Sequence, residues 1–194
     1  DIQNMGYEVI LVSSGAIAVG INKLNLKERP SSMRMKQAAA AVGQCSIMYL
    51  YDKFFGEYDK TIAQILLNAT DMEQEEKKEN LINTFNALLE MGIIPIVNEN
   101  DSVSYTEIES EDRLFGDNDV LSAVVAVLCR AKLLVILSDI DGLYDADPRL
   151  HTNAKRIKRI EQIDESVYSL AGGAGSRRGT GGMKTKLKAA ELAA

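Results

Sequence analysis

One stretch of the sequence decides the fold: Ile93-Ile94-Pro95-Ile96-Val97-Asn98-Glu99-Asn100-Asp101. Its β-branched run over 93–97 is typical of a short buried strand, and four polar residues follow where that strand is expected to end. After a polar loop from Ser102 to Leu114, Gly116-Asp117-Asn118-Asp119 leads into an apolar helical segment, Val120 to Leu128. Asp and Asn before a helix act as N-caps and suit the positive end of its dipole. The sequence therefore predicts two acidic, amide-rich clusters that together can hold a polar ligand.

Similar short apolar runs recur along the chain and alternate with helical patterns. The other predicted strands lie at 8–12, 61–67 and 133–137, and the predicted helices lie at 33–58 (interrupted near Gly43), 73–91, 161–170 and from about Met183 onward. Continuous apolar strands between helices are typical of a parallel sheet that helices cover on both faces. We therefore expect an α/β fold with a mainly parallel sheet, in one domain over residues 1–194.

Composition and charge narrow the function classes. The 194 residues carry a net charge of −6, which gives no electrostatic support to a nucleic-acid partner. No apolar run reaches the ~18 residues of a membrane span, and we expect no signal peptide. Cys45 and Cys129 stand alone in apolar segments, so we expect two core residues of a reducing, cytoplasmic compartment. With His151 as the only histidine, we expect no protein metal site.

Polar residues follow each predicted strand. The four strand ends are Ser13-Ser14-Gly15, Asn68-Ala69-Thr70, Asn98-Glu99-Asn100-Asp101 and Ser138-Asp139. In an open parallel sheet, ligands bind beyond the carboxyl ends of the strands, so these groups are expected to converge on one ligand-binding edge. The alternative is that they only make turns, which use Ser, Asn, Asp and Gly in any case.

A glycine-rich segment near the end of the chain predicts a phosphate site. Gly179-Thr180-Gly181-Gly182-Met183-Lys184-Thr185-Lys186 places bare backbone, a hydroxyl and lysines at a helix N-terminus. Backbone N–H groups and the helix dipole attract phosphate there, and Lys186 adds a point charge. The segment matches neither the Walker A pattern nor GxGxxG after a strand. A flexible glycine hinge before an amphipathic helix is the competing interpretation.

Six ordered motifs together resemble the amino acid kinase family. They are Val12-Ser13-Ser14-Gly15-Ala16, Gln37-Ala38-Ala39-Ala40-Ala41-Val42-Gly43-Gln44, Asn98-Glu99-Asn100-Asp101, Gly116-Asp117-Asn118-Asp119, Leu137-Ser138-Asp139-Ile140-Asp141-Gly142-Leu143-Tyr144 and the segment from Gly179 to Lys186. The resemblance spans nearly the whole chain. It is closest to the members that phosphorylate glutamate, and the spelling of two acidic motifs is nearer to the stand-alone bacterial enzymes than to the bifunctional eukaryotic synthase.

The resemblance implies an αβα three-layer sandwich that transfers the γ-phosphoryl group of ATP, with Mg²⁺, to the side-chain carboxylate of L-glutamate, the first step of proline synthesis. It assigns roles residue by residue. Positions similar to the family's glutamate-binding residues are Ser14, Gly15, Ala16, Asp101 and Asn118. Positions similar to its nucleotide-binding residues are Ser138, Asp139, Thr180, Gly181, Gly182, Met183, Lys184, Thr185 and Lys186. Lys186 resembles a catalytic lysine, and Asp119 resembles the aspartate that holds the lysines.

Two departures from the family pattern bear on activity. The family's first strand, with a phosphate-binding lysine in a Val-Lys-x-Gly motif, does not precede Asp1, and its last strands do not follow Ala194. We therefore expect both ends to be truncated, and we expect these residues alone not to catalyse the reaction.

Several alternatives remain at this point. Another kinase of the family, acting on acetylglutamate, aspartate, carbamate or UMP, competes with the glutamate assignment, as does a non-catalytic sensor of an amino acid or nucleotide. The acidic loop Ser102 to Leu114 either carries feedback control by proline or is a disordered surface loop. The apolar helix at 33–56 either forms a homo-oligomer interface or packs in the core.

Overall fold

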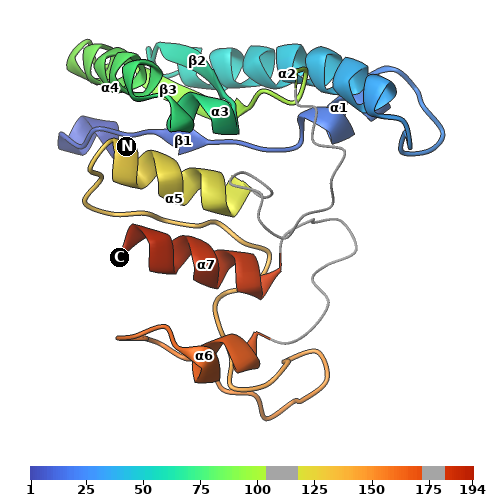
Figure 1. The fold of residues 1–194 in the computed structure, drawn as a ribbon, viewed down its shortest axis with the longest axis vertical. Helices are drawn as coiled ribbons and strands as arrows, with labels where there is room; N and C mark the ends of the chain where they lie inside the picture. The colour runs from blue at the N-terminus through green and yellow to red at the C-terminus, as the bar shows by residue number, and fades with distance from the viewer. Residues whose placement is uncertain (104–117, 172–181) are drawn as a thin grey trace. The chain divides into compact units, whose positions relative to one another are not determined.

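The computed structural model describes residues 1–103, 118–171 and 182–194, and the chain divides into two compact units, Asp1–Phe115 and Gly116–Ala194. Figure 1 labels the helices and strands of both units. The first unit contains η1 (Gln3–Met5), β1 (Leu11–Val12), α1 (Ala16–Lys23), α2 (Met33–Gly56), β2 (Ile62–Leu67), α3 (Ala69–Glu73), α4 (Glu75–Glu90) and β3 (Ile94–Glu99). The second contains α5 (Asn118–Leu128), α6 (Glu165–Leu170) and α7 (Met183–Ala193).

A three-stranded parallel sheet organises the first unit. Its strand order is β1-β3-β2, with Leu11 opposite Ile96 on one side of β3 and Ile62 opposite Ile94 on the other. The central strand is buried because its β-branched residues face neighbours on both sides, and Ile96 and Val97 have no exposed surface. In Figure 1, α2 and α4 both lie above β1. The predicted α/β class with a parallel sheet is confirmed.

The strand β3 runs two residues further than the sequence predicts. It includes Asn98 and Glu99, which the sequence analysis places beyond its end. Asn98 is only 1% exposed, and its Nδ2 donates a hydrogen bond of 2.9 Å to Oε1 of Gln44 on α2. A buried amide is tolerated in a strand when such a partner satisfies it, so polarity alone does not mark the strand end.

The long helix α2 is continuous where an interruption at Gly43 is expected. Gly43 is instead a contact residue, because a Cβ placed on it would lie 1.8 Å from the carbonyl oxygen of Ala16 on α1. Gly20 of α1 approaches Ala39 of α2 equally closely. Glycine at these two positions lets the two backbones touch, so the helix-breaking tendency of Gly43 is outweighed by packing.

The helix predicted at 73–91 is confirmed by α4, which begins two residues later than predicted. Its apolar face is anchored by Phe85, which has no exposed surface. The short helix α3 precedes it and begins with a capping box, in which the backbone N–H of Asn68 donates to Oδ2 of Asp71 at 2.9 Å. The box satisfies backbone donors that a helix start leaves open.

The second unit has its own small apolar core. The buried residues of this core are Leu143 in the segment between α5 and α6, Ala171 at the end of α6, and Leu187 in α7. Helix α6 begins at Glu165 and not at the predicted position 161, because the Asp164 carboxylate accepts hydrogen bonds from the backbone N–H groups of Ser166 and Val167 and so caps the helix there.

The predicted fourth strand at 133–137 is wrong as a description of this structure. The segment forms no strand, and Leu133, Val135 and Leu137 are 77%, 65% and 86% exposed. A strand exists only as a member of a sheet, since its backbone groups need a partner strand. The apolar run lacks such a partner within the described residues.

The cysteine prediction is wrong for Cys45, which is exposed on α2, and Cys129 is half-buried. The buried positions of α2 around it are Gly43, Gln44 and Ile47, so Cys45 lies just off the packed face. Burial raises the pKa of the Cys129 thiol to about 11, which keeps this thiol protonated at neutral pH.

Candidate functional site

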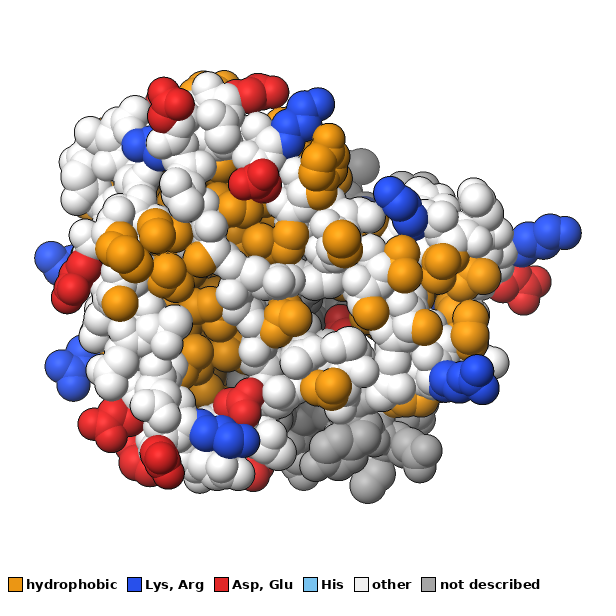
Figure 2. All heavy atoms as spheres, turned by 90° about the horizontal axis from the view of Figure 1, so that it is seen from above, with side chains coloured by type: hydrophobic (Ala, Val, Ile, Leu, Met, Phe, Trp, Pro, Cys, Tyr) orange, Lys and Arg blue, Asp and Glu red, His pale blue; other side chains and the backbone are white. Residues whose placement is uncertain are grey.

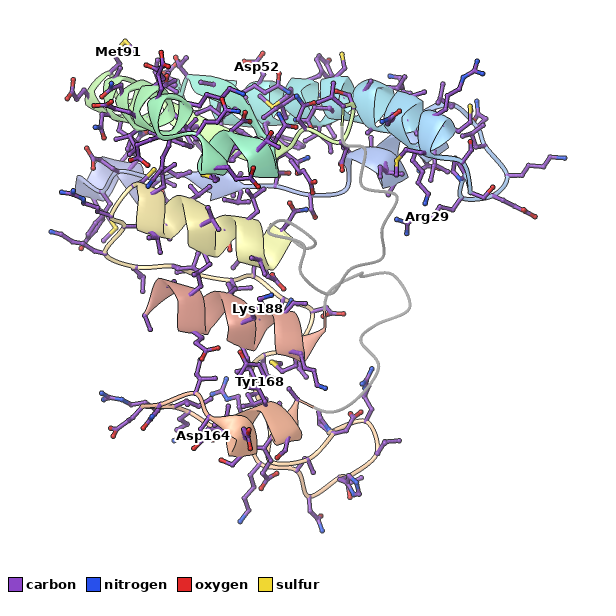
Figure 3. All side chains as sticks on the ribbon, in the orientation of Figure 1. Arg29, Asp52, Met91, Asp164, Tyr168 and Lys188 are labelled. Atoms are coloured by element: carbon purple, nitrogen blue, oxygen red, sulfur yellow. The ribbon has the colours of Figure 1, made fainter. Side chains whose placement is uncertain are left out.

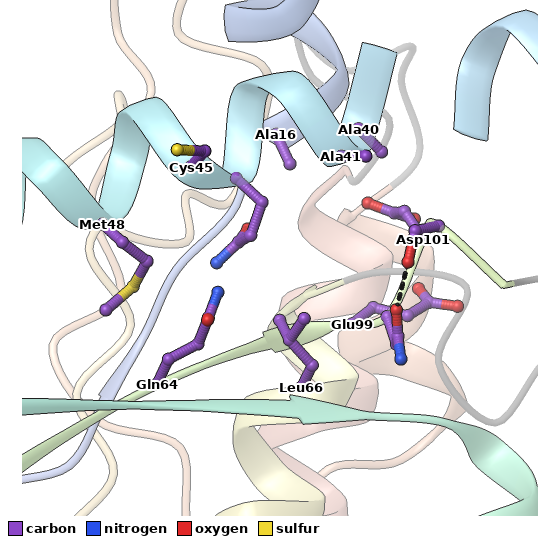
Figure 4. A pocket seen from close by; sticks show the side chains of 12 residues that line it. Ala16, Ala40, Ala41, Cys45, Met48, Gln64, Leu66, Glu99 and Asp101 are labelled. Atoms are coloured by element: carbon purple, nitrogen blue, oxygen red, sulfur yellow. Dashed lines mark hydrogen bonds between the residues drawn. The ribbon is translucent and has the colours of Figure 1, made fainter. Parts of the chain in front are cut away.

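A cavity of about 430 Å³ lies in the first unit, between α2 and the carboxyl ends of two strands (Figure 4). Its lining comes from the start of α1, one face of α2, the strands β2 and β3 and the turn after β3. The lining residues are Ala16, Ala40, Ala41, Gln44, Cys45, Met48, Gln64, Leu66, Glu99, Asn100, Asp101 and Ser102. The cavity therefore occupies the sheet edge at which parallel folds bind ligands.

The turn from β1 into α1 builds one part of this region. Ser13 is held in place, because its N–H donates to the carbonyl of Val97 at 2.8 Å and its Oγ lies 3.0 Å from the hydroxyl of Tyr51. Gly15 then adopts a left-handed conformation with φ of 92°, which glycine adopts without steric cost. Ser14 and Gly15 are exposed, and Ala16 is buried at the cavity wall. The first N–H groups of α1 lack helical partners and are available to a carboxylate.

The turn after β3 supplies the acidic side of the cavity. The N–H of Asn100 donates to the carbonyl of Leu67 at 2.8 Å, and its Oδ1 accepts a hydrogen bond of 2.6 Å from Ser102, drawn as the dashed line in Figure 4. This pairing fixes the turn that presents Asp101. Burial raises the pKa of the Asp101 carboxyl, and no described residue makes a hydrogen bond or ion pair with it. A half-buried carboxylate with no partner among the described residues favours a cationic ligand.

A second cluster joins α5 and α7 within the second unit. The Nζ of Lys186 lies 2.8 Å from Oδ2 of Asp119, and Thr185 Oγ1 donates to the same oxygen at 3.1 Å. Thr185 Oγ1 also lies 2.8 Å from the carbonyl of Gly182, the N-cap of α7. The carboxylate of Asp119 thus orients an ammonium group at the start of a helix, where the dipole also favours anions.

Ser138 and Asp139 form a separate exposed turn. Ser138 Oγ donates to Asp139 Oδ1 at 3.4 Å and accepts from the N–H of Ile140 at the same distance. Both side chains are exposed, so they are available to a ligand's hydroxyl or amino groups.

Comparison with known proteins decides the family. A sequence profile described as the amino acid kinase family matches residues 1–194. The chain belongs to the amino acid kinase family. This membership confirms the resemblance that the six motifs indicate.

Three bacterial relatives of the chain share the name glutamate 5-kinase. The chain is 57% identical to glutamate 5-kinase of Clostridium perfringens over 193 residues, which cover 100% of the chain and 71% of the relative. It is 51% identical to glutamate 5-kinase of Enterococcus faecalis, covering 98% and 70% of the two chains. The match to glutamate 5-kinase of Carboxydothermus hydrogenoformans is 53% identical and covers 100% of the chain but 50% of the relative.

The two units of this amino acid kinase chain gather different subsets of the predicted site residues. Ala16 and Asp101 line the cavity of the first unit, and Asp119, Thr185 and Lys186 form the bonded cluster of the second. Other predicted residues lie beside these groups or elsewhere: Ser14 and Gly15 in the turn before α1, Asn118 in the first turn of α5, Gly182, Met183 and Lys184 at the start of α7, and Ser138 and Asp139 in their own turn. Thr180 and Gly181 lie outside the described residues.

The sequence assigns no role to Gln44 and Gln64, two amides of the cavity lining. Asn98, the hydrogen-bond partner of Gln44, was expected only as one of the polar groups at a strand end. The sequence could have indicated that Gln44 is buried, because Ala40, Gln44 and Ile47 have the spacing of one helix face, which is the buried face of α2. A glutamine on that face has to find a buried partner or a ligand.

Proposed function

We propose that this chain carries the glutamate 5-kinase activity of its relatives: transfer of the γ-phosphoryl group of ATP to the side-chain carboxylate of L-glutamate, giving glutamyl 5-phosphate in the first step of proline synthesis. The observation that carries the proposal is the 57% identity to a glutamate 5-kinase over 100% of the chain. Six ordered motifs spread over both units support the proposal, because they contain polar and charged residues that can contact a substrate as well as residues of the core.

The amino acid end of the substrate fits the cavity of the first unit. Asp101 is half-buried and acidic, and its carboxylate is available to the α-ammonium group of glutamate. Ser14 and the backbone of Gly15 and Ala16 are proposed to bind a carboxylate. Asn118 of the second unit is proposed as a further glutamate-binding residue from the family resemblance alone. The burial of Asp101 supports this role, because an ammonium partner would offset the cost of a buried negative charge.

The phosphoryl end needs positive charge, because a carboxylate attacks a polyanion. Lys186 supplies an ammonium group that Asp119 holds in one position. The segment from Thr180 to Lys186 is proposed to bind the ATP phosphates, and Ser138 and Asp139 the nucleoside. Mg²⁺ is proposed to arrive on the triphosphate, since it is commonly held by one or two carboxylates together with phosphate oxygens. When bound, it neutralises phosphate charge.

A panel of phosphoryl acceptors tests the proposal on the full-length protein. ATP consumption is measured with L-glutamate, N-acetylglutamate, aspartate, carbamate and UMP, which covers the other activities of the fold. We expect turnover with glutamate and at least ~100-fold lower kcat/KM with N-acetylglutamate, which lacks the ammonium group that Asp101 would bind. Equal rates with the two compounds would contradict the proposal. ATP binding without turnover on any acceptor would favour a non-catalytic sensor instead.

Three further properties belong to this proposal. Proline is proposed to compete with glutamate, so proline should raise the KM for glutamate without lowering kcat. The loop at 102–114 is the segment that the sequence connects with this control, and most of it lies outside the described residues.

A homo-oligomer is proposed through α2, which exposes Tyr49, Leu50 and Phe54. Figure 2 shows apolar side chains gathered on the face seen there. The compartment is proposed to be the cytoplasm. Within the described residues, no helix is both long and apolar enough to cross a membrane.

A further inference from the structure

Gln44 presents an unusual buried donor at the cavity of the first unit. The residue is 8% exposed, lines the cavity and accepts a hydrogen bond at Oε1 from Asn98 Nδ2 at 2.9 Å. Asn98 is in turn fixed, because its Oδ1 accepts from the backbone N–H of Glu99 at 2.9 Å. These bonds determine which end of the Gln44 amide is oxygen and which is nitrogen. The Nε2 atom is buried and has no hydrogen-bond partner in the described part of the chain.

An unsatisfied buried N–H group costs free energy, so its persistence beside a cavity indicates a ligand with an acceptor oxygen. The same cavity contains a second amide, Gln64, which Figure 4 shows reaching from β2 toward α2. Its charged groups are Glu99 and Asp101, and its described lining includes no Lys, Arg or His. Among the described lining residues, only neutral donors are therefore available to a carboxylate that enters this cavity.

We propose that Gln44 is a specificity-determining residue, which donates a hydrogen bond from Nε2 to the α-carboxylate of the amino acid whose α-ammonium group pairs with Asp101. The inference rests on the proposed function, because it assigns the partner of one substrate group. An α-amino acid carries its ammonium and α-carboxylate on one carbon, so a cavity that binds both needs an acceptor and a donor on neighbouring walls. Asp101 is the acceptor and Gln44 the donor. Asn98 is then a positioning residue that holds the Gln44 amide in this orientation.

The test compares two ligands that differ only at the α-carboxylate: L-glutamate and its α-carboxamide. Binding of each to the full-length protein is measured by calorimetry without ATP, for the wild type, Gln44→Glu and Gln44→Met. The Gln44→Glu change keeps the oxygen that accepts from Asn98 and removes the donor, so the tie between α2 and β3 is preserved. Gln74→Glu is the matched control, because Gln74 is exposed at the start of α4 and outside the cavity.

We expect Gln44→Glu to weaken binding of L-glutamate by about 10- to 100-fold, the range for a hydrogen bond to a charged group. The α-carboxamide should be weakened less than about threefold, because its own NH₂ group can donate to the new carboxylate. Gln44→Met should also reduce the preference for the α-carboxylate, and Gln74→Glu should change neither ligand.

A merely structural role predicts a different result, in which both ligands weaken by the same factor in each Gln44 variant. That outcome, with a wild type that binds glutamate, would overturn the inference and leave the proposed function intact. A correctly folded wild type that binds neither glutamate nor ATP would overturn the proposed function and this inference with it.

Discussion

The ammonium group of Lys186 lies 2.8 Å from the carboxylate of Asp119, and the two side chains are only 22% and 15% exposed. Lys186 lies in the first turn of α7 and Asp119 in the first turn of α5, and Thr185 donates a hydrogen bond to the same carboxylate oxygen. A partly buried, hydrogen-bonded pair of this kind holds a long flexible lysine in one direction. Preorganised charge of that kind is what phosphoryl transfer to a carboxylate requires.

Replacing Lys186 by alanine should lower kcat for glutamate phosphorylation by roughly 10²–10³, the scale of losing one preorganised contact to the transition state. Steady-state kinetics on the full-length protein measure the effect. Lys188→Ala is the matched control, because Lys188 is exposed on the same helix (Figure 3). A kcat that is unchanged in Lys186→Ala would remove this residue from the mechanism.

Replacing Asp101 by asparagine should raise the KM for glutamate more than any other kinetic parameter. The substitution keeps the size of the side chain and removes the negative charge proposed to bind the α-ammonium group. Because that contact is made in the ground state and the transition state alike, kcat should change little. The KM values for glutamate and for ATP are measured separately. A defect confined to ATP would contradict the role of Asp101.

The same substitution should change how stability depends on pH. Burial raises the pKa of Asp101 above its ordinary value of 3.8, so the folded protein binds this proton more tightly than the unfolded chain. That contribution to stability is present in full below pH 3.8 and is lost as the pH rises through the raised pKa. Asp101→Asn should therefore gain free energy of unfolding relative to the wild type as the pH rises from about 4 to about 7.

Urea unfolding at several pH values measures this difference without added ligand. Asp52→Asn, at an exposed position of α2 (Figure 3), reports the effect of the same charge change on the surface. A difference between Asp101→Asn and the wild type that stays constant or falls with pH would show that burial does not perturb this carboxyl.

Two glycines of α2 should respond to alanine in opposite directions. At Gly43 a Cβ would lie 1.8 Å from the carbonyl oxygen of Ala16, so α1 and α2 must separate. Overpacking of this kind costs about 1–3 kcal/mol and occasionally more, so Gly43→Ala should unfold at a lower denaturant concentration. At Gly56 nothing lies within 4 Å of a Cβ, so Gly56→Ala should stabilise the helix by up to about 1 kcal/mol.

Equal stability of Gly43→Ala and the wild type in urea unfolding would mean that the two helices do not touch at this point. The Gly43 variant also has a functional readout. Because the contact is to Ala16, which begins α1 at the cavity wall, we expect its glutamate KM to rise while its ATP KM stays the same.

The sequence by itself determined the elements whose signals are local. The β-branched run at 93–97 specified a buried strand, because such residues fit a pleated surface packed on both sides. The apolar spacing around Phe85 specified α4, and the change from glycines to good helix formers near Met183 specified the start of α7. The ordered motifs also specified the family, since they are read directly from residue identities.

Tertiary structure decided what depends on partners distant in the chain. Gln44 and Asn98 are 54 residues apart, so no local pattern could pair them. Asp119 and Lys186 are 67 residues apart, and only the family resemblance connected them before the structure showed their bond. Glycine has a low helix propensity, so Gly43 suggests a helix break, but in the structure it is the point at which α2 contacts α1. The apolar run at 133–137 has the composition of a strand and still forms none, because a strand requires a neighbour to accept its hydrogen bonds. Local propensity indicates where a helix or strand can form, and contacts with residues distant in the chain determine whether it forms and what it packs against.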